Sequence, residues 1–172
     1  MPDALISGAL LTDTILGHGL PAAAEHHLTQ AGLCWHDEPK AEAHLAQALL
    51  IAPDHAAVLI GLYRYYFYKR RLPDALDIAE LCLVKACRDN GFPEDWRQVT
   101  SADAAFGRYE EILPRFFLLT LKGYAYLSMR LGQLNAGREA IDKLLELDPD
   151  DRIGARVLLD VANRVGVDDD DD

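Results

Sequence analysis

Histidine and cysteine are the residues of this chain whose side chains most readily bind metals or attack substrates. The sequence holds six histidines and three cysteines. The adjacent His26 and His27 point to different faces of a helix, and no histidine pair shares one helix with a cysteine at a spacing that holds zinc. We therefore predict no metal site and no cofactor.

The cysteines, Cys34, Cys82 and Cys87, are odd in number and match no zinc or redox motif. Free cysteine is among the most buried residue types, so the simplest interpretation is buried thiols in a reducing compartment. A cysteine nucleophile needs a base and an orienting residue in a cleft, and no glycine-rich phosphate loop is present. The sequence predicts that the protein is not an enzyme.

Two aromatic residues, Phe92 and Trp96, stand in the segment GFPEDWRQVTSADAAFGRYEEILP. Long loops in compact domains are often functional, and a loop between packed helices exposes its aromatic rings unless it folds back. Trp96 is therefore a candidate contact for a partner. The alternative is that both rings plug a gap between helices, and the sequence leaves the two open.

A pattern of small and apolar residues that occurs twice indicates the elements that position these groups. The two copies lie 34 positions apart, and each marks one face of a helix. A fixed period of this length is typical of helical repeats. The first copy is Ala41, Leu45, Ala48 and Leu49, and the second is Ala75, Ala79, Cys82 and Leu83.

Prolines and glycines divide the chain into hairpins, because they end helices. The pattern predicts an all-α fold, a short α-solenoid of about three helical hairpins, with a helical domain over 21–166. Its predicted parts are an N-terminal helix (1–20), hairpins at about 22–52, 56–89 and 115–148, an insertion (90–114) with a short helix over roughly 102–112, a capping helix (152–165) and an acidic tail (167–172).

Composition and charge narrow the kinds of partner. The formal net charge is −11, with an unbroken acidic run from Asp168 to Asp172. A phosphate-binding surface normally comes with a basic balance, so nucleic acid is not an expected partner. No apolar run approaches the ~18 residues of a membrane span, and no signal peptide is recognised. We expect a cytoplasmic protein with no membrane contact, whose tail is solubilising or touches a basic partner.

Three segments resemble the second helix of tetratricopeptide repeats: AEAHLAQALLIAPDH (41–55), LPDALDIAELCLVKA (72–86) and GQLNAGREAIDKLLELDPDD (132–151). The family's closing proline is met by Pro53 and Pro149, while the second repeat has Cys87 in that phase. The first helices match poorly, because larger or polar residues replace two of the usual small ones; the positions hold Thr29, Tyr63 and Ala125.

In this family the first helices of successive repeats line a groove that holds a peptide. Among the positions of the second and third repeats that the resemblance implies face this groove, seven are candidate partner contacts: Arg64, Phe67, Tyr68, Lys122, Tyr126, Met129 and Arg130. Arginine pairs with carboxylates and aromatic rings supply contact area, so the expected partner is a protein or peptide with apolar anchors and acidic groups. The alternatives are aromatic rings that fill space between hairpins and basic residues on a solvated helix face.

The carboxylate clamp of chaperone-binding family members is not expected, because those phases hold Gln30, Arg64 and Tyr126. The runs YRYYFYKRRL, GFPEDW and PRFFLLTLKGYAYL resemble small tetratricopeptide proteins encoded among bacterial nitrogen-fixation genes. That resemblance implies an adaptor or assembly factor that binds a peptide segment of a partner. The alternative is a secretion-type chaperone of a hydrophobic client, and the sequence leaves the oligomeric state open.

Overall fold

A computed structural model describes residues 19–108 and 110–168, with side chains described as far as Arg164. Every regular element in this part of the chain is a helix, which confirms the predicted all-α class. The helices are α2 (Ala22–Leu33), α3 (Glu38–Ile51), α4 (Ala56–Tyr68), α5 (Leu72–Asn90), the 3-10 turn η2 (Trp96–Gln98), α6 (Ile112–Arg130), α7 (Leu134–Leu147) and α8 (Arg156–Asp168). The helix predicted over 1–20 and most of the acidic tail lie outside the described residues.

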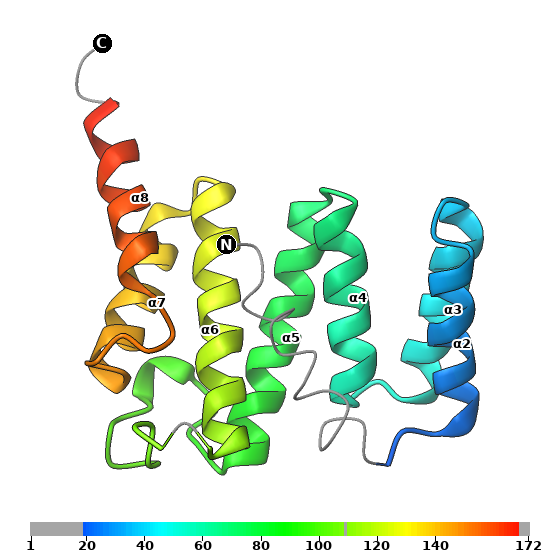
Figure 1. The fold of residues 1–172 in the computed structure, drawn as a ribbon, viewed down its shortest axis with the longest axis horizontal. Coiled ribbons are helices and arrows are strands. Elements are labelled where there is room, and N and C mark those ends of the chain that lie inside the picture. Colours follow the sequence, from blue (N-terminus) through cyan, green and yellow to red (C-terminus); the bar gives the residue numbers. More distant parts are fainter. Residues whose placement is uncertain (1–18, 109, 169–172) are drawn as a thin grey trace.

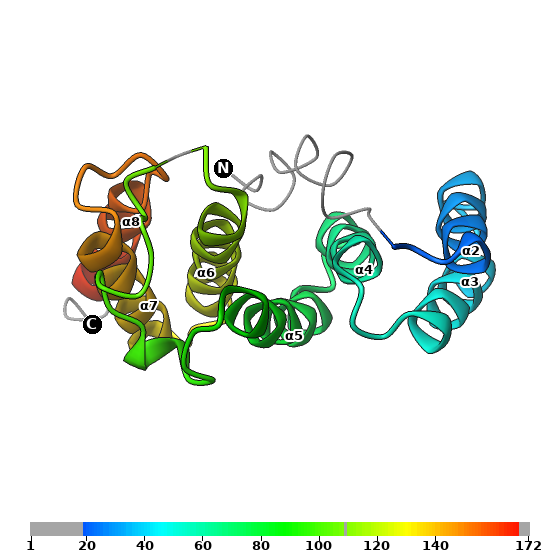
Figure 2. The same cartoon turned by 90° about the horizontal axis from the view of Figure 1, so that it is seen from below.

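Consecutive helices pair into three hairpins, α2–α3, α4–α5 and α6–α7, and α8 packs against α7 (Figure 1). Seen from below, α2, α4 and α6 form one row and α3, α5 and α7 form the other (Figure 2). The second and third hairpins join through an extensive α5–α6 contact, whereas α3 and α4 touch less. The architecture is therefore a helical-repeat arrangement whose first hairpin is the least tightly attached.

The repeated stripe of small and apolar residues lies in the core. Each second helix contributes three buried residues at the same phase: Ala41, Leu45 and Ala48 of α3, Ala75, Ala79 and Cys82 of α5, and Gly137, Ile141 and Leu144 of α7. Small residues at the start of the stripe let the neighbouring helix approach closely. A Cβ atom on Gly137 would lie 2.7 Å from Cγ of Met129 in α6.

The second hairpin departs from the repeat because its second helix has no proline stop. With Cys87 in that phase, α5 continues to Asn90, and Gly91 ends it with a left-handed φ of +67°. The backbone N–H of Phe92 then donates to the Cys87 carbonyl at 2.9 Å, which closes the helix end.

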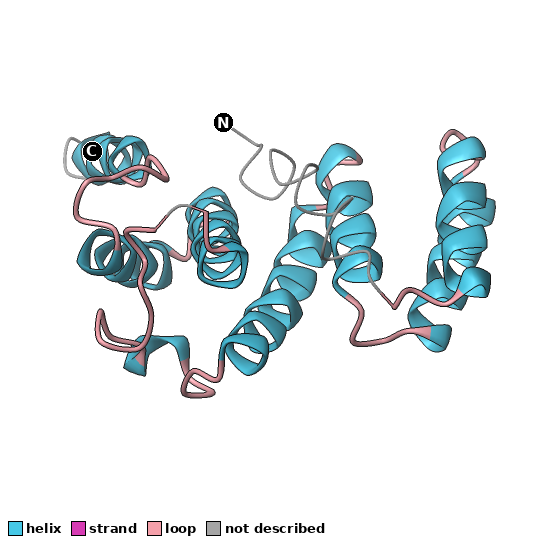
Figure 3. Ribbon diagram, turned by 60° about the horizontal axis from the view of Figure 1, so that its bottom comes forward, coloured by secondary structure: helices cyan, strands magenta, loops and turns pink. Residues whose placement is uncertain are grey.

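The segment between α5 and α6 is mostly loop, apart from η2 (Figure 3). The short helix expected over 102–112 is not formed, since residues 101–108 are turns and bends and α6 begins at Ile112. The Asp103 carboxylate accepts from the backbone N–H of Thr100 at 2.7 Å and from its hydroxyl. This local turn competes with a helix start at Ser101.

The last helix, α8, begins at Arg156 and not at Arg152. The residues before it are held in a turn by two carboxylates: Asp148 accepts from the N–H of Ile153 at 2.9 Å, and Asp151 accepts from that of Ala155 at 2.6 Å. Asp151 itself has a left-handed φ of +52°. Its side chain therefore caps the turn of chain that precedes α8.

Candidate peptide-binding surface

A groove of about 470 Å³ lies between α2 and α4, where the first and second hairpins meet. Its lining is mainly apolar and aromatic, with one basic group: Leu28, Ala31, Gly32, Trp35, Leu45, Gly61, Arg64, Tyr65 and Tyr68. The two helices come close at Gly61, where an added Cβ atom would lie 3.2 Å from Cδ2 of Leu28. Arg64 and Tyr68, both predicted to face a groove, do line this one.

Four aromatic rings form a continuous series that starts at this groove and crosses to α6. The ring centroids are 6.4 Å apart for Trp35 and Tyr68, 5.8 Å for Tyr68 and Phe67, and 6.2 Å for Phe67 and Tyr126. Each separation is within the range of favourable ring contacts. We call these four residues the aromatic strip. Tyr68 is 50% exposed and the other three are half-buried.

Trp35 was not among the residues predicted for the groove. It lies in the turn after α2, beyond the point where the repeat phase assigns groove positions. Its ring meets the Tyr65 ring edge-on at 5.2 Å, and the Lys69 ammonium lies 5.3 Å from its centroid. The signal available in the sequence was a tryptophan beside a helix end, which does not distinguish a groove from a core.

Tyr65 closes the floor of the groove and is fully buried. Its hydroxyl donates to Oε1 of Glu42 on α3 at 3.3 Å. Burial, together with the Glu42 charge, raises the pKa of Tyr65 to about 12, so the phenol is neutral at physiological pH. Arg71 also binds Glu42 and pairs with Asp74 at 2.9 Å, which ties α3 to the start of α5. This network joins the first hairpin, through α3, to Tyr65 of α4 and to the start of α5.

Two exposed arginines accompany the aromatic strip. Arg64 lines the groove, and the Arg130 guanidinium lies 5.6 Å from the Tyr126 ring centroid while its Nη1 donates to the Tyr126 hydroxyl at 2.6 Å. Within the described part of the chain, no carboxylate forms an ion pair with either arginine. Among the described residues, therefore, neither guanidinium is neutralised by a carboxylate.

Trp96, a candidate partner contact, is 7% exposed and belongs to the packed interior. Its ring meets Tyr124 of α6 at 5.8 Å, and Arg97 covers it with the guanidinium 4.4 Å from the ring centroid. Arg97 is held there by Glu139 of α7 at 2.9 Å. Of the two interpretations left open, the structure favours the packing plug, because the side chain is not accessible to a partner.

Met129 and Lys122 also lie apart from the open surface. Met129 is 9% exposed and fills the space over Gly137, where α7 has no side chain. The Lys122 ammonium donates to the carbonyl of Ile153 at 2.7 Å, under the turn before α8, and burial lowers its pKa. Packing against α7 and the following turn removes both from the binding residues proposed below.

The environments of the three cysteines are poorly suited to nucleophilic chemistry. Burial raises the pKa of Cys82 to about 12 and that of Cys87 to about 11, so both thiols stay protonated. The Cys34 thiol donates to the carbonyl of Gln30 at 3.0 Å. These environments suit structural cysteines.

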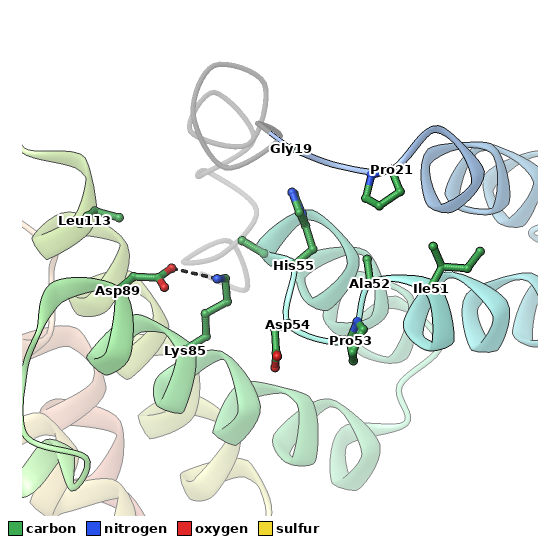
Figure 4. A pocket seen from close by; sticks show the side chains of 11 residues that line it. Gly19, Pro21, Ile51, Ala52, Pro53, Asp54, His55, Lys85, Asp89 and Leu113 are labelled. Atoms are coloured by element: carbon green, nitrogen blue, oxygen red, sulfur yellow. Dashed lines mark ion pairs between the residues drawn. The ribbon is translucent and has the colours of Figure 1, made fainter.

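A second hollow of about 500 Å³ lies at the opposite end of the helices, around the turn between α3 and α4 (Figure 4). Its charged lining is paired within the protein, since Lys85 binds Asp89 at 2.9 Å. The His55 ring accepts from the N–H of Ala57 as a helix cap. Among its described lining residues there is no aromatic ring apart from this histidine, so the hollow lacks the contact surface that the aromatic strip provides.

The protein is thus an array of helical hairpins with an aromatic groove where the first and second hairpins meet. Among the described residues, no helix combines the length and hydropathy that crossing a membrane requires. No family model matches the chain, and no solved structure matches it.

A protein of Azotobacter chroococcum mcd 1, named "Uncharacterized 19.8 kDa protein in nifW 5'region", is 42% identical to this chain over 125 residues. The alignment spans 72% of this chain and 70% of the relative. The chain therefore belongs to the same family as that nif-region protein.

Proposed function

We propose that the protein is a tetratricopeptide-like adaptor or assembly factor, linked to nitrogen fixation, that binds a peptide segment of a partner protein along the aromatic strip. The observation that carries this proposal is the unbroken ring series from Trp35 to Tyr126, which joins the turn after α2 to α4 and α6 and is flanked by Arg64 and Arg130. Aromatic and arginine side chains dominate the binding energy of many interfaces.

The groove has the size and chemistry of a site for side chains. Its volume of about 470 Å³ falls within the range of roughly 300–1,000 Å³ found for ligand pockets. One large apolar side chain of a peptide fits against Leu28 and the Trp35 ring, where it is shielded from water. A carboxylate beside that anchor meets Arg64, and a second, further along, meets Arg130.

The charge distribution favours an acidic partner segment in spite of the acidic chain. The net charge of −11 repels acidic partners at long range, but screening confines that effect to about 8–10 Å at physiological salt. At contact distance, the attraction between the two arginines and the partner's carboxylates outweighs this screened repulsion. A segment with apolar anchors and nearby carboxylates is therefore the expected ligand.

The link to nitrogen fixation is supported by the position of the relative's gene, since the relative is named for the nifW 5' region. This favours a client among nitrogen-fixation proteins over the hydrophobic client of a secretion system. Affinity purification from the native host, grown under nitrogen-fixing conditions, would identify the client by mass spectrometry.

A charge-swap experiment tests the mode of binding. Arg64→Glu should weaken binding of the identified partner at least about tenfold, or ~1.4 kcal/mol, because a carboxylate then faces a carboxylate. Arg88→Glu is the matched control, since Arg88 is exposed on α5 and makes only a 3.9 Å contact to Asp54. Replacing the partner's acidic residue by lysine should restore binding to Arg64→Glu. Equal binding by wild type, Arg64→Glu and Arg88→Glu would contradict the proposal.

A further inference from the structure

Two glycines stand in the walls of the groove between α2 and α4. Gly32 on α2 and Gly61 on α4 both belong to its lining. Glycine destabilises a helix relative to alanine, because its unfolded backbone has more conformational freedom to lose. Neither residue has the positive φ that would require glycine. The two helices therefore carry these glycines for another reason.

Packing inside the protein does not supply that reason. A Cβ atom added at Gly32 would meet no neighbouring side chain or helix of the described chain within 4 Å. At Gly61 the nearest atom would be the flexible end of the Leu28 side chain, at 3.2 Å. Gly137 differs, since Met129 fills the space that its missing side chain leaves. Gly32 and Gly61 instead open onto the groove, and glycine is the residue that lets a ligand approach a backbone closely.

The rings around this opening favour an aromatic ligand. Trp35 meets Tyr65 edge-on at 5.2 Å and Tyr68 at 6.4 Å, and all three residues line the groove. Aromatic rings attract one another in edge-to-face and offset arrangements, beyond the gain from buried area. A planar ring that enters beside the two glycines continues this arrangement, whereas an aliphatic side chain gains only the buried area.

The charge at the same place favours a carboxylate next to that ring. Arg64 follows Gly61 by three residues, so the two lie on one face of α4. Among the described residues, no carboxylate forms an ion pair with Arg64. A guanidinium binds a carboxylate through two parallel hydrogen bonds. The groove thus offers a slot for a ring and, one helical turn away, a partner for an acidic group.

We propose that Gly32 and Gly61 are specificity-determining residues, which open the groove to an aromatic side chain of the partner. An aspartate or glutamate next to this aromatic residue in the partner's segment pairs with Arg64. The inference rests on the proposed function and specifies the anchor residue that the groove selects.

Titration of the full, isotope-labelled chain with the tripeptide acetyl-Asp-Trp-Asp-amide tests this choice, with amide chemical shifts in NMR spectra as the readout. Binding in the millimolar range is expected for so small a ligand, with the shifts centred on Gly32 and Gly61. Acetyl-Asn-Trp-Asn-amide lacks the carboxylates and should bind about fivefold more weakly. Acetyl-Asp-Leu-Asp-amide lacks the ring and should bind at least about twofold more weakly.

Gly32→Leu should fill the slot and abolish binding of acetyl-Asp-Trp-Asp-amide. Leucine is a better helix former than glycine, so thermal unfolding should show that this variant is at least as stable as wild type. Ala43→Leu is the matched control, because Ala43 is exposed on α3 and outside the groove lining, and it should bind like wild type.

Three results would overturn the inference: no shifts at Gly32 and Gly61, unchanged binding by Gly32→Leu, or equal affinity for the tryptophan and leucine tripeptides. Failure of the inference is distinguishable from failure of the proposed function. If wild type did not bind the tryptophan tripeptide but partner binding still depended on Arg64, the aromatic anchor would be wrong and the binding surface would stand.

Discussion

The two junctions between hairpins use aromatic residues in opposite ways. At the junction of the second and third hairpins, Phe92 and Phe106 of the insertion pack on Phe117 of α6 at 5.2 and 6.3 Å. At the junction of the first and second hairpins there is no insertion, and Trp35 and Tyr68 border an open groove. Whether aromatic rings become core or open surface therefore depends on whether an insertion fills the junction, more than on the number of aromatic residues there.

The largest effect on stability is expected at the junction of the second and third hairpins, which the insertion fills. Phe117 is fully buried among the insertion rings, so Phe117→Ala should lower the free energy of unfolding by about 3–5 kcal/mol. Urea denaturation followed by circular dichroism measures this. The contrasting substitution is Tyr68→Ala, at the junction of the first and second hairpins. It should lower the free energy of unfolding far less, because Tyr68 is half exposed. Equal losses of unfolding free energy for the two variants would show that the two junctions do not differ in packing.

A glycine-to-alanine pair compares the first junction with the interior of the third hairpin, where α7 packs on α6, by the same chemical change. At Gly137 the new methyl would lie 2.7 Å from Cγ of Met129 and 3.3 Å from the Ala125 carbonyl, so Gly137→Ala should destabilise by about 1–3 kcal/mol. At Gly61 the only close atom is the end of the Leu28 side chain, and the helix gains up to ~1 kcal/mol in propensity.

We expect Gly61→Ala to change stability by less than about 1 kcal/mol in either direction. Thermal and urea unfolding of the two variants side by side provide the measurement. If Gly61→Ala proved the more damaging of the two, the first junction would be packed at least as tightly as the interior of the third hairpin.

A smaller effect on stability is expected at high pH from Tyr65, at the floor of the groove. The folded-state pKa of Tyr65, about 12, lies above its ordinary value of 10.0, so the neutral phenol stabilises the fold. This contribution is complete below pH 10 and is lost as the pH rises from about 10 to 12. Tyr65→Phe has no proton to lose there. Its stability should fall less steeply than that of wild type over this range, and parallel curves from pH-dependent urea unfolding would contradict the assignment.

The sequence predicted those features that depend on local phase. The stripe from Ala41 to Ala48 predicted a buried helix face, because a helix turns by a fixed angle per residue. The same phase placed Arg64, Phe67 and Tyr68 on one side of α4. The phase failed for Met129, which fills the space left by the missing side chain of Gly137 on α7. The expectation that the insertion exposes its aromatic rings failed for Trp96, because its ring packs on Tyr124 of α6 and Arg97 covers it. In both cases a residue far along the chain, Gly137 or Tyr124, decides the burial.

The resemblance to tetratricopeptide repeats is closer in the second helices of the hairpins than in the first helices. The second helices keep the family's small residues because each packs on its hairpin partner. The first helix of the second repeat, α4, carries Tyr63 where that family has a small residue, and here Tyr63 is buried and stacks on Phe67 at 5.9 Å. A large ring at the crossing belongs to the same cluster that forms the aromatic strip. The departure from the family pattern and the candidate site are thus one structural feature.

The most direct test is photo-crosslinking at position 68. A benzophenone amino acid in place of Tyr68 should form an adduct with the partner in the native host, and the same probe in place of Leu81 should not. The two side chains are matched in exposure, at 50% and 49%, but Leu81 lies on α5 in the other row of helices. An adduct at position 68 that Arg64→Glu suppresses is the predicted result. Equal adducts at the two positions, or an adduct at position 81 alone, would contradict the account.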